Sequence, residues 1–307
     1  MTFTRREEHI TYKDRPTKVI VYSAQDTQEI MDGLKTLTEK HGKVSEYDLF
    51  TGRKYDEWSG AKSKEEAWEL LRHGTNKKKL MEEVKSYIDE VNAGVVVEKY
   101  RDIEYRPFGC AVCVPRMLSG NPNCMILPKK APVKTRVIKL LVDCGVSAYF
   151  SSEDYKRVGS VIARAINDVE MAGYRVRMHA VDVTYNDRKN DSKILCTHVM
   201  IKGENEPMNL QRLLYPIAES SFLRHLGFTT VNRADGWSNS YELYPILDRD
   251  NNPQDRLNLY TAINGPGSIM LRMQHLGNVL KEGNAEDVKK VVQMIFKADD
   301  ELVQGGN

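Results

Sequence analysis

The chain has 307 residues, of which 41% are hydrophobic and 29% are charged, a balance typical of a folded globular protein with about two domains. Its 45 lysine and arginine residues nearly balance its 43 aspartate and glutamate residues, and the net charge of +2 excludes a global attraction to nucleic acid or anionic lipid. The sequence has no apolar run of the roughly 18 residues that a membrane span needs, no apolar secretion segment after its first residues, and only five cysteines. We therefore expect a cytoplasmic protein without a disulfide framework.

The first hundred residues are predicted to be mainly helical. Residues 17–22 form an apolar run that indicates a strand, and Asp26 with Glu29 then gives the capping-box pattern of a helix start. Two more helices are predicted, one that ends at Gly74 and one over residues 80–94.

The composition changes near residue 100. Residues 101–113 look extended, and residues 114–132 carry four prolines, which is typical of an irregular connector. We place a domain boundary at its end. The prediction is a mainly helical N-terminal region with a Pro-rich connector over residues 1–132, followed by an α/β domain over residues 133–307.

The connector region contains Cys110, Cys113 and Cys124. A structural zinc site needs four tetrahedral ligands, and one CxxC pair with one further cysteine and no nearby histidine falls short of that number. We predict that these cysteines hold no metal.

The most basic stretch of the chain comes next. It carries five cations and no acid within eleven residues, namely Lys129, Lys130, Lys134, Arg136 and Lys139. Two interpretations stay open for this run, a solvated linker and a contact with nucleic-acid phosphate.

The following segment has the pattern of a βαβ unit. Residues 137–142 read as a buried strand that ends at Asp143, a capped amphipathic helix covers residues 151–173, and residues 174–183 read as a second strand. A parallel pairing of these two strands is the default. His179 on the second strand and His198 on a third predicted strand are expected to be neighbours. Later elements are predicted as strands near 242–247 and 269–273 and a helix opened by Asn284.

Asp143, Gly145 and Ser147 lie where the first strand of this unit leaves the sheet. Ligands collect at the carboxyl ends of strands in α/β folds, and a carboxylate with a hydroxyl oxygen suits a hard cation such as Mg²⁺. The competing interpretation is that Asp143 caps its own loop and Ser147 is solvated.

The stretch Leu140-Leu-Val-Asp-Cys-Gly-Val-Ser-Ala, with the capped helix and the strand after it, resembles the opening βαβ of a von Willebrand factor A-like domain. The metal site of that family is written Asp-x-Ser-x-Ser. The resemblance implies a Rossmann-like three-layer domain that mediates protein contacts. Gly145 replaces the first serine, so we expect no cofactor beyond weak Mg²⁺ binding at Asp143 and Ser147. Asp143, Gly145 and Ser147 are then expected to face a protein partner.

A second resemblance concerns the order of segments. A segment that runs from Trp58 to Gly74, the Pro-rich connector, the βαβ unit and Ser221-Phe-Leu-Arg-His-Leu-Gly-Phe228 follow one another as in a group of uncharacterised tailed-bacteriophage proteins. The likeness covers residues 58–230. It implies a viral source and a fold, and it brings no catalytic residues with it.

Three functions are carried forward. The first is a non-catalytic, phage-encoded adaptor that contacts a host factor or an AAA+ ATPase. The second is a nucleic-acid-binding factor that uses the basic stretch over residues 129–139. The third is a metal-dependent hydrolase, which would need at least two carboxylates besides Asp143. Binding is favoured over catalysis, no catalytic residue is assigned, and no membrane contact is expected.

Overall fold

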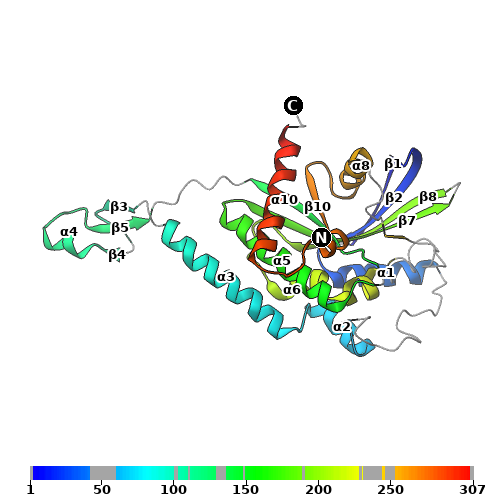
Figure 1. The fold of residues 1–307 in the computed structure, drawn as a ribbon, viewed down its shortest axis with the longest axis horizontal. Coiled ribbons are helices and arrows are strands. Elements are labelled where there is room, and N and C mark those ends of the chain that lie inside the picture. The colour runs from blue at the N-terminus through cyan, green and yellow to red at the C-terminus, as the bar shows by residue number, and fades with distance from the viewer. Residues whose placement is uncertain are drawn as a thin grey trace.

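A computed structural model describes residues 3–41, 60–99, 103–109, 111–128, 136–147, 149–188, 191–227, 230, 244–245 and 253–304. Its main feature is a mixed sheet in the order β1-β2-β8-β7-β6-β10, with the short β9 paired to β7 (Figure 1). The strands of this sheet are β1 (Thr4–Tyr12), β2 (Arg15–Ala24), β6 (Val137–Asp143), β7 (Arg175–Arg188), β8 (Asp191–Lys202), β9 (Tyr244–Pro245) and β10 (Ser268–Arg272).

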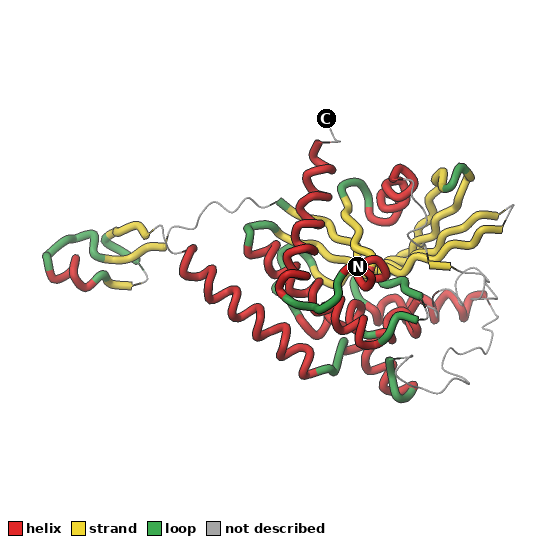
Figure 2. Tube along the Cα trace, viewed as in Figure 1, coloured by secondary structure: helices red, strands yellow, loops and turns green. Residues whose placement is uncertain are grey.

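Most of the described helices pack on one face of this sheet, and α8 packs on the other (Figure 2). The helices are α1 (Thr27–His41), α2 (Lys64–His73), α3 (Lys78–Lys99), α5 (Ser152–Met171), α6 (Leu210–Ala218), the π-helix η1 (Phe222–Gly227), α8 (Pro253–Asn264), α9 (Met273–Val279) and α10 (Ala285–Gln304). The chain is thus a mixed α/β protein, and a large apolar cluster lies between the sheet and α1, α2, α3, α5, α6 and α10.

The predicted helical start of the chain is wrong. The N-terminus begins with a β-hairpin, in which Lys13 and Asp14 adopt positive φ angles of 52° and 58° at the turn. β1 is an edge strand with many charged, exposed residues. It therefore lacks the apolar pattern by which a strand is predicted from sequence. Cross-strand charge pairing supports it, since Lys18 Nζ lies 2.7 Å from Glu7 Oε2.

The hairpin belongs to the main sheet because β2 pairs in parallel with β8. The predicted boundary at residue 132 stays a prediction. A fragment that begins at residue 133 would leave the β8 edge without its partner strand, and this bears on any attempt to separate the two regions.

The predicted βαβ unit is confirmed. β6 and β7 pair in parallel, α5 connects them, and Ser151 with Asp154 forms the full capping box at its start. β8 returns antiparallel to β7, and β10 pairs in parallel with the other side of β6. Numbered in chain order, the four strands β6, β7, β8 and β10 thus have the spatial order 3-2-1-4, which matches four of the six positions of the doubly wound order, with β8 antiparallel.

A small sheet in the order β3-β5-β4 lies beyond the far end of α3 (Figure 1). It consists of β3 (Ile103–Arg106), β4 (Ala111–Val112), the helix α4 (Val114–Leu118) and β5 (Met125–Pro128). Strands β3 and β4 fall within residues 101–113, the segment predicted as extended, whereas α4 and β5 fall in the connector predicted as irregular. Pro115 lies in the first turn of α4, where a missing N–H costs nothing, and the Cys113 N–H donates to the Cys124 carbonyl oxygen at 2.7 Å. Pro115 and Pro128 thus lie in the first turn of a helix and at the end of a strand, where they are compatible with secondary structure.

Candidate functional site at the carboxyl ends of β6 and β10

Two strand ends lie side by side at the β10 edge of the main sheet. Asp143 at the end of β6 is the register partner of Arg272 at the end of β10. The chain leaves β6 through α5 and leaves β10 through α9 and α10, which all pack in the same apolar cluster. The strand order reverses between these two ends, because β7 lies on one side of β6 and β10 on the other, and ligands of α/β proteins bind at such a switch point.

The loop after β6 is held by its own polar groups. The Gly145 N–H donates to Asp143 Oδ1 at 3.0 Å, and Arg272 Nε lies 3.8 Å from Asp143 Oδ2. On the far side of the loop, the Ser147 N–H donates to Gln274 Oε1 at 2.7 Å. Asp143 and Gly145 are buried and Ser147 is half-buried, so of this predicted partner-binding set only Ser147 reaches the surface.

Asp182 on β7 is a second carboxyl group in this region, and sequence reasoning missed it. Its exposed fraction is 2%, and neither carboxyl oxygen has a hydrogen-bond partner within the described chain. The π-helix backbone closes over it, because a Cβ added at Gly227 would lie 2.3 Å from Asp182 Oδ2. Burial, with a smaller contribution from the charge of Asp143, raises the pKa of Asp182 to about 8. Asp182 is therefore mainly a neutral acid at pH 7.

Other buried groups complete this polar cluster. Burial raises the pKa of the Cys144 thiol well above its usual range, and a protonated thiol is a poor nucleophile. The Tyr155 hydroxyl is buried, and burial raises its pKa as well. Arg224 Nη2 donates to the Phe150 carbonyl oxygen at 3.1 Å, and its guanidinium lies 5.8 Å from the Tyr155 ring centroid. The interior of this end thus combines the neutral Cys144 and Tyr155 side chains with the buried Arg224 guanidinium and the Asp143–Arg272 ion pair.

Tyr149 is the side chain that this end of the sheet presents to solvent, with an exposed fraction of 97%. The two residues that flank it in the described chain, Ser147 and Phe150, are held in place. The Phe150 N–H donates to the Ser147 carbonyl oxygen at 3.1 Å, and the Phe150 ring packs against α9 at Gly277. Sequence reasoning did not single out Tyr149, although the pair Tyr149-Phe150 directly before a helix cap was the available signal.

The predicted neighbours His179 and His198 do face each other. Their rings stack with centroids 4.4 Å apart and planes inclined by 22°. Burial lowers the pKa of His179 to about 4 and that of His198 to about 3, so both rings are neutral at pH 7. Both rings lie on the face of the sheet that α8 covers, where they act as core side chains.

The predicted basic stretch is only partly described. Lys129, Lys130 and Lys134 lie outside the described residues, as does Cys110. Arg136 Nη2 donates to Asp299 Oδ1 at 2.8 Å, and Lys139 Nζ donates to the Pro266 carbonyl oxygen at 3.2 Å. Both described cations of this stretch are therefore engaged within the chain.

The cysteines and acids give no ready metal centre in the part of the chain that is described. Cys113 and Cys124 are half-buried free cysteines. Across the described ranges, no group of three or more His, Cys, Asp or Glu side chains is arranged to hold a metal ion. Within the same ranges, no helix is long and apolar enough to cross a membrane.

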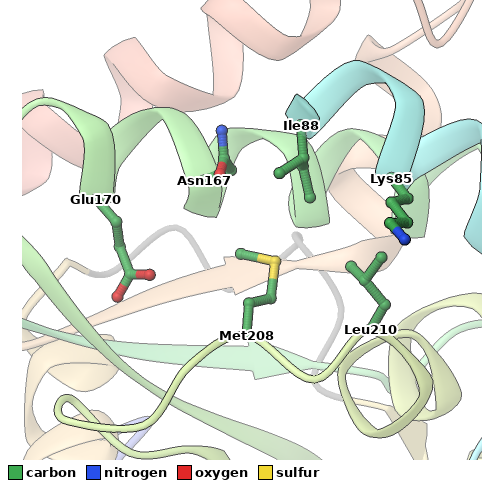
Figure 3. Close-up of a pocket in the computed structure, with 6 residues that line it drawn as sticks. All are labelled: Lys85, Ile88, Asn167, Glu170, Met208 and Leu210. Carbon is green, nitrogen blue, oxygen red and sulfur yellow. The ribbon is translucent and has the colours of Figure 1, made fainter. Parts of the chain in front are cut away.

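A pocket of about 490 Å³ opens at the other end of α5 (Figure 3). It is lined by Lys85, Ile88, Asn167, Glu170, Met208 and Leu210. Asn167 follows Ser152 by fifteen residues, or roughly 20 Å along the helix, so this pocket is separate from the strand ends. Lys202 Nζ donates to Glu170 Oε1 at 2.7 Å, and this ion pair balances the charge of the carboxylate in the wall of the pocket.

The fold and the site define a mixed α/β protein with a buried polar cluster at a switch point and an exposed tyrosine above it. A family model described as a domain of unknown function, DUF7192, matches residues 6–249, and the chain belongs to this family. The match extends from β1 to β9 and includes the small sheet and the loop after β6. No curated protein and no solved structure matches the chain.

Proposed function

We propose that this chain is a non-catalytic binding protein whose partner is another protein, held at the loop over residues 143–150. The observation that carries the proposal is the 97% exposure of Tyr149 on a turn fixed from both sides. Tyrosine is enriched among the residues that dominate binding energy, because it supplies a large contact area at a small entropy cost. The buried residues beneath it, Asp143 and Gly145, act as a rigid base for this contact.

The neighbouring surface fits a protein contact. Ser147 is half-buried two residues before Tyr149, and the Gln274 side chain that holds the loop belongs to α9. Val279 at the end of α9 is 39% exposed. Aromatic residues are enriched at the centres of protein interfaces, which favours Tyr149 as the anchor of such a contact.

The 3-2-1-4 order of β6, β7, β8 and β10 supports the von Willebrand factor A-like interpretation of this region, a class that serves protein contacts. In a tailed-phage setting the partner would be a host factor or an AAA+ ATPase. The proposal includes only weak binding of Mg²⁺ at the loop, because Asp143 already accepts the Gly145 N–H and has the Arg272 guanidinium beside it.

Affinity purification from the cells that make the protein, followed by mass spectrometry with and without nuclease, tests this function. We expect a protein recovered in near-stoichiometric amount that survives nuclease. Tyr149→Ala should lose it, and the matched control Leu257→Ala, at an exposed apolar residue on α8, should keep it. Recovery that disappears with nuclease would instead favour nucleic acid held by the basic stretch and would contradict the adaptor function.

A further inference from the structure

The small sheet over residues 103–128, which we call the β3–β5 module, differs from the main sheet in the burial of its described side chains. From Tyr105 to Ile126, no residue whose burial is described is buried, and none of these residues belongs to either hydrophobic cluster of the protein. A sheet this small gains stability only when one of its faces packs against another layer. Its folded state therefore requires a surface that covers it.

The side chains that need a cover are concentrated on this module. Its exposed large hydrophobic residues are Phe108 (62%), Val112 (42%), Val114 (56%), Met117 (52%) and Leu118 (78%). Met117 and Leu118 lie three and four residues after Val114 along α4, which places the three side chains on one face of the helix. The module thus carries five exposed apolar side chains on elements that lie beyond the end of α3 (Figure 1).

The composition of the module favours a protein as the cover. Its charged residues are Glu104, Arg106 and Arg116, and it has no lysine. The Arg116 guanidinium lies 3.8 Å from the Tyr105 ring centroid, so this cation is already stacked on an aromatic ring. Aromatic residues, methionine and arginine are enriched at protein interfaces, whereas lysine and acids are depleted there. Membrane surfaces and nucleic acids are bound by clustered cations, which the module itself lacks.

We propose that the β3–β5 module is a self-association surface, where its apolar face packs against the same face of a second copy across a two-fold axis. Five side chains with these exposures leave on the order of 500 Å² of apolar surface on each copy. Two copies would together bury about 1,000 Å² if these side chains were covered completely, which is about the smallest area expected of a specific interface. The net charge of +1 over residues 103–128 opposes this pairing only weakly. Each module then supplies the second layer that the other lacks.

Sedimentation equilibrium of the full chain between about 1 and 100 µM tests the proposal. We expect the wild-type protein to be a dimer at the upper concentration. Leu118→Glu places a charge at the centre of the apolar face and should weaken dimerisation at least tenfold. Leu257→Glu is the matched control, because it makes the same change at a 43% exposed residue on α8, and it should leave the dimer intact.

Hydrogen exchange provides a second readout that does not depend on a variant. Backbone amides of the β3–β5 module should become better protected as the concentration of the wild-type protein rises, while those of α5 should not change. A wild-type chain that stays monomeric at 100 µM overturns the proposal. A dimer that Leu118→Glu and Leu257→Glu affect equally overturns it as well, because the contact would then lie elsewhere.

Discussion

Asp182 makes a sharp prediction about the pH dependence of folding. Its pKa is raised from 3.8 to about 8 by burial, so the folded chain holds this proton over a pH range in which the unfolded chain releases it. The stability that Asp182 contributes is therefore complete below about pH 4 and is lost as the pH rises towards 8. Between about pH 4, where the loss begins, and pH 7, the loss extends over about three pH units. This corresponds to roughly 4 kcal/mol of lost unfolding free energy.

The variant Asp182→Asn keeps the shape of the side chain and removes its ionisation. Its amide donors remain buried without partners, which costs about 1–3 kcal/mol at every pH, so the informative quantity is the slope. Between pH 5 and 7 the unfolding free energy of the wild type, measured by urea denaturation, should fall relative to the variant by about 1.4 kcal/mol per pH unit, and the slope should flatten near pH 8.

The control for this experiment is Asp300→Asn, at an exposed aspartate on α10, which should follow the wild-type profile. Parallel profiles for the wild type and Asp182→Asn would refute the reasoning. They would mean that Asp182 ionises in the folded protein as readily as in the unfolded chain, and that the strand ends are accessible to water.

Three further predictions follow from the same region and from the predicted boundary. Gly227→Ala should destabilise the fold by about 1–3 kcal/mol in urea denaturation, because its Cβ meets Asp182 Oδ2, and the loss should shrink when Asp182 is alanine. Limited proteolysis should cut first between about residues 120 and 136, and an isolated fragment 133–307 should not show a cooperative melt, since β8 would lack β2. Calorimetry with Mg²⁺ should give no submillimolar affinity, and any weak binding should disappear in Asp143→Ala.

Local signals in the sequence were sufficient for elements whose ends are marked. The helix start at Ser151 and Asp154 and the helix end at Gly74 coincide with the structure, because capping is decided by residues within one turn. The strand that ends at Asp143 was also predictable, since buried parallel strands are nearly continuous apolar runs. Helix α3 passes the predicted stop at Gly94 and ends at Lys99, so a glycine within a helix is a weaker signal.

The features that the sequence concealed depend on contacts between distant segments. β1 is a charged edge strand whose place is set by pairing with β2. Asp182 lies in an ordinary strand pattern, and only the approach of Gly227, 45 residues later, turns it into a buried acid. The position of Asp143 at a strand end was predictable, whereas its burial against Arg272 depends on the β10 pairing.

The central claim is that the loop over residues 143–150 holds a protein partner through Tyr149. The most direct measurement is the dissociation constant of the recovered, purified partner for immobilised wild-type chain, Tyr149→Ala and the control Leu257→Ala. Removal of a central aromatic anchor should weaken binding by tenfold or more, while the control should match the wild type. Equal dissociation constants for Tyr149→Ala and the wild type would contradict the account, because the loop would then have no part in the contact.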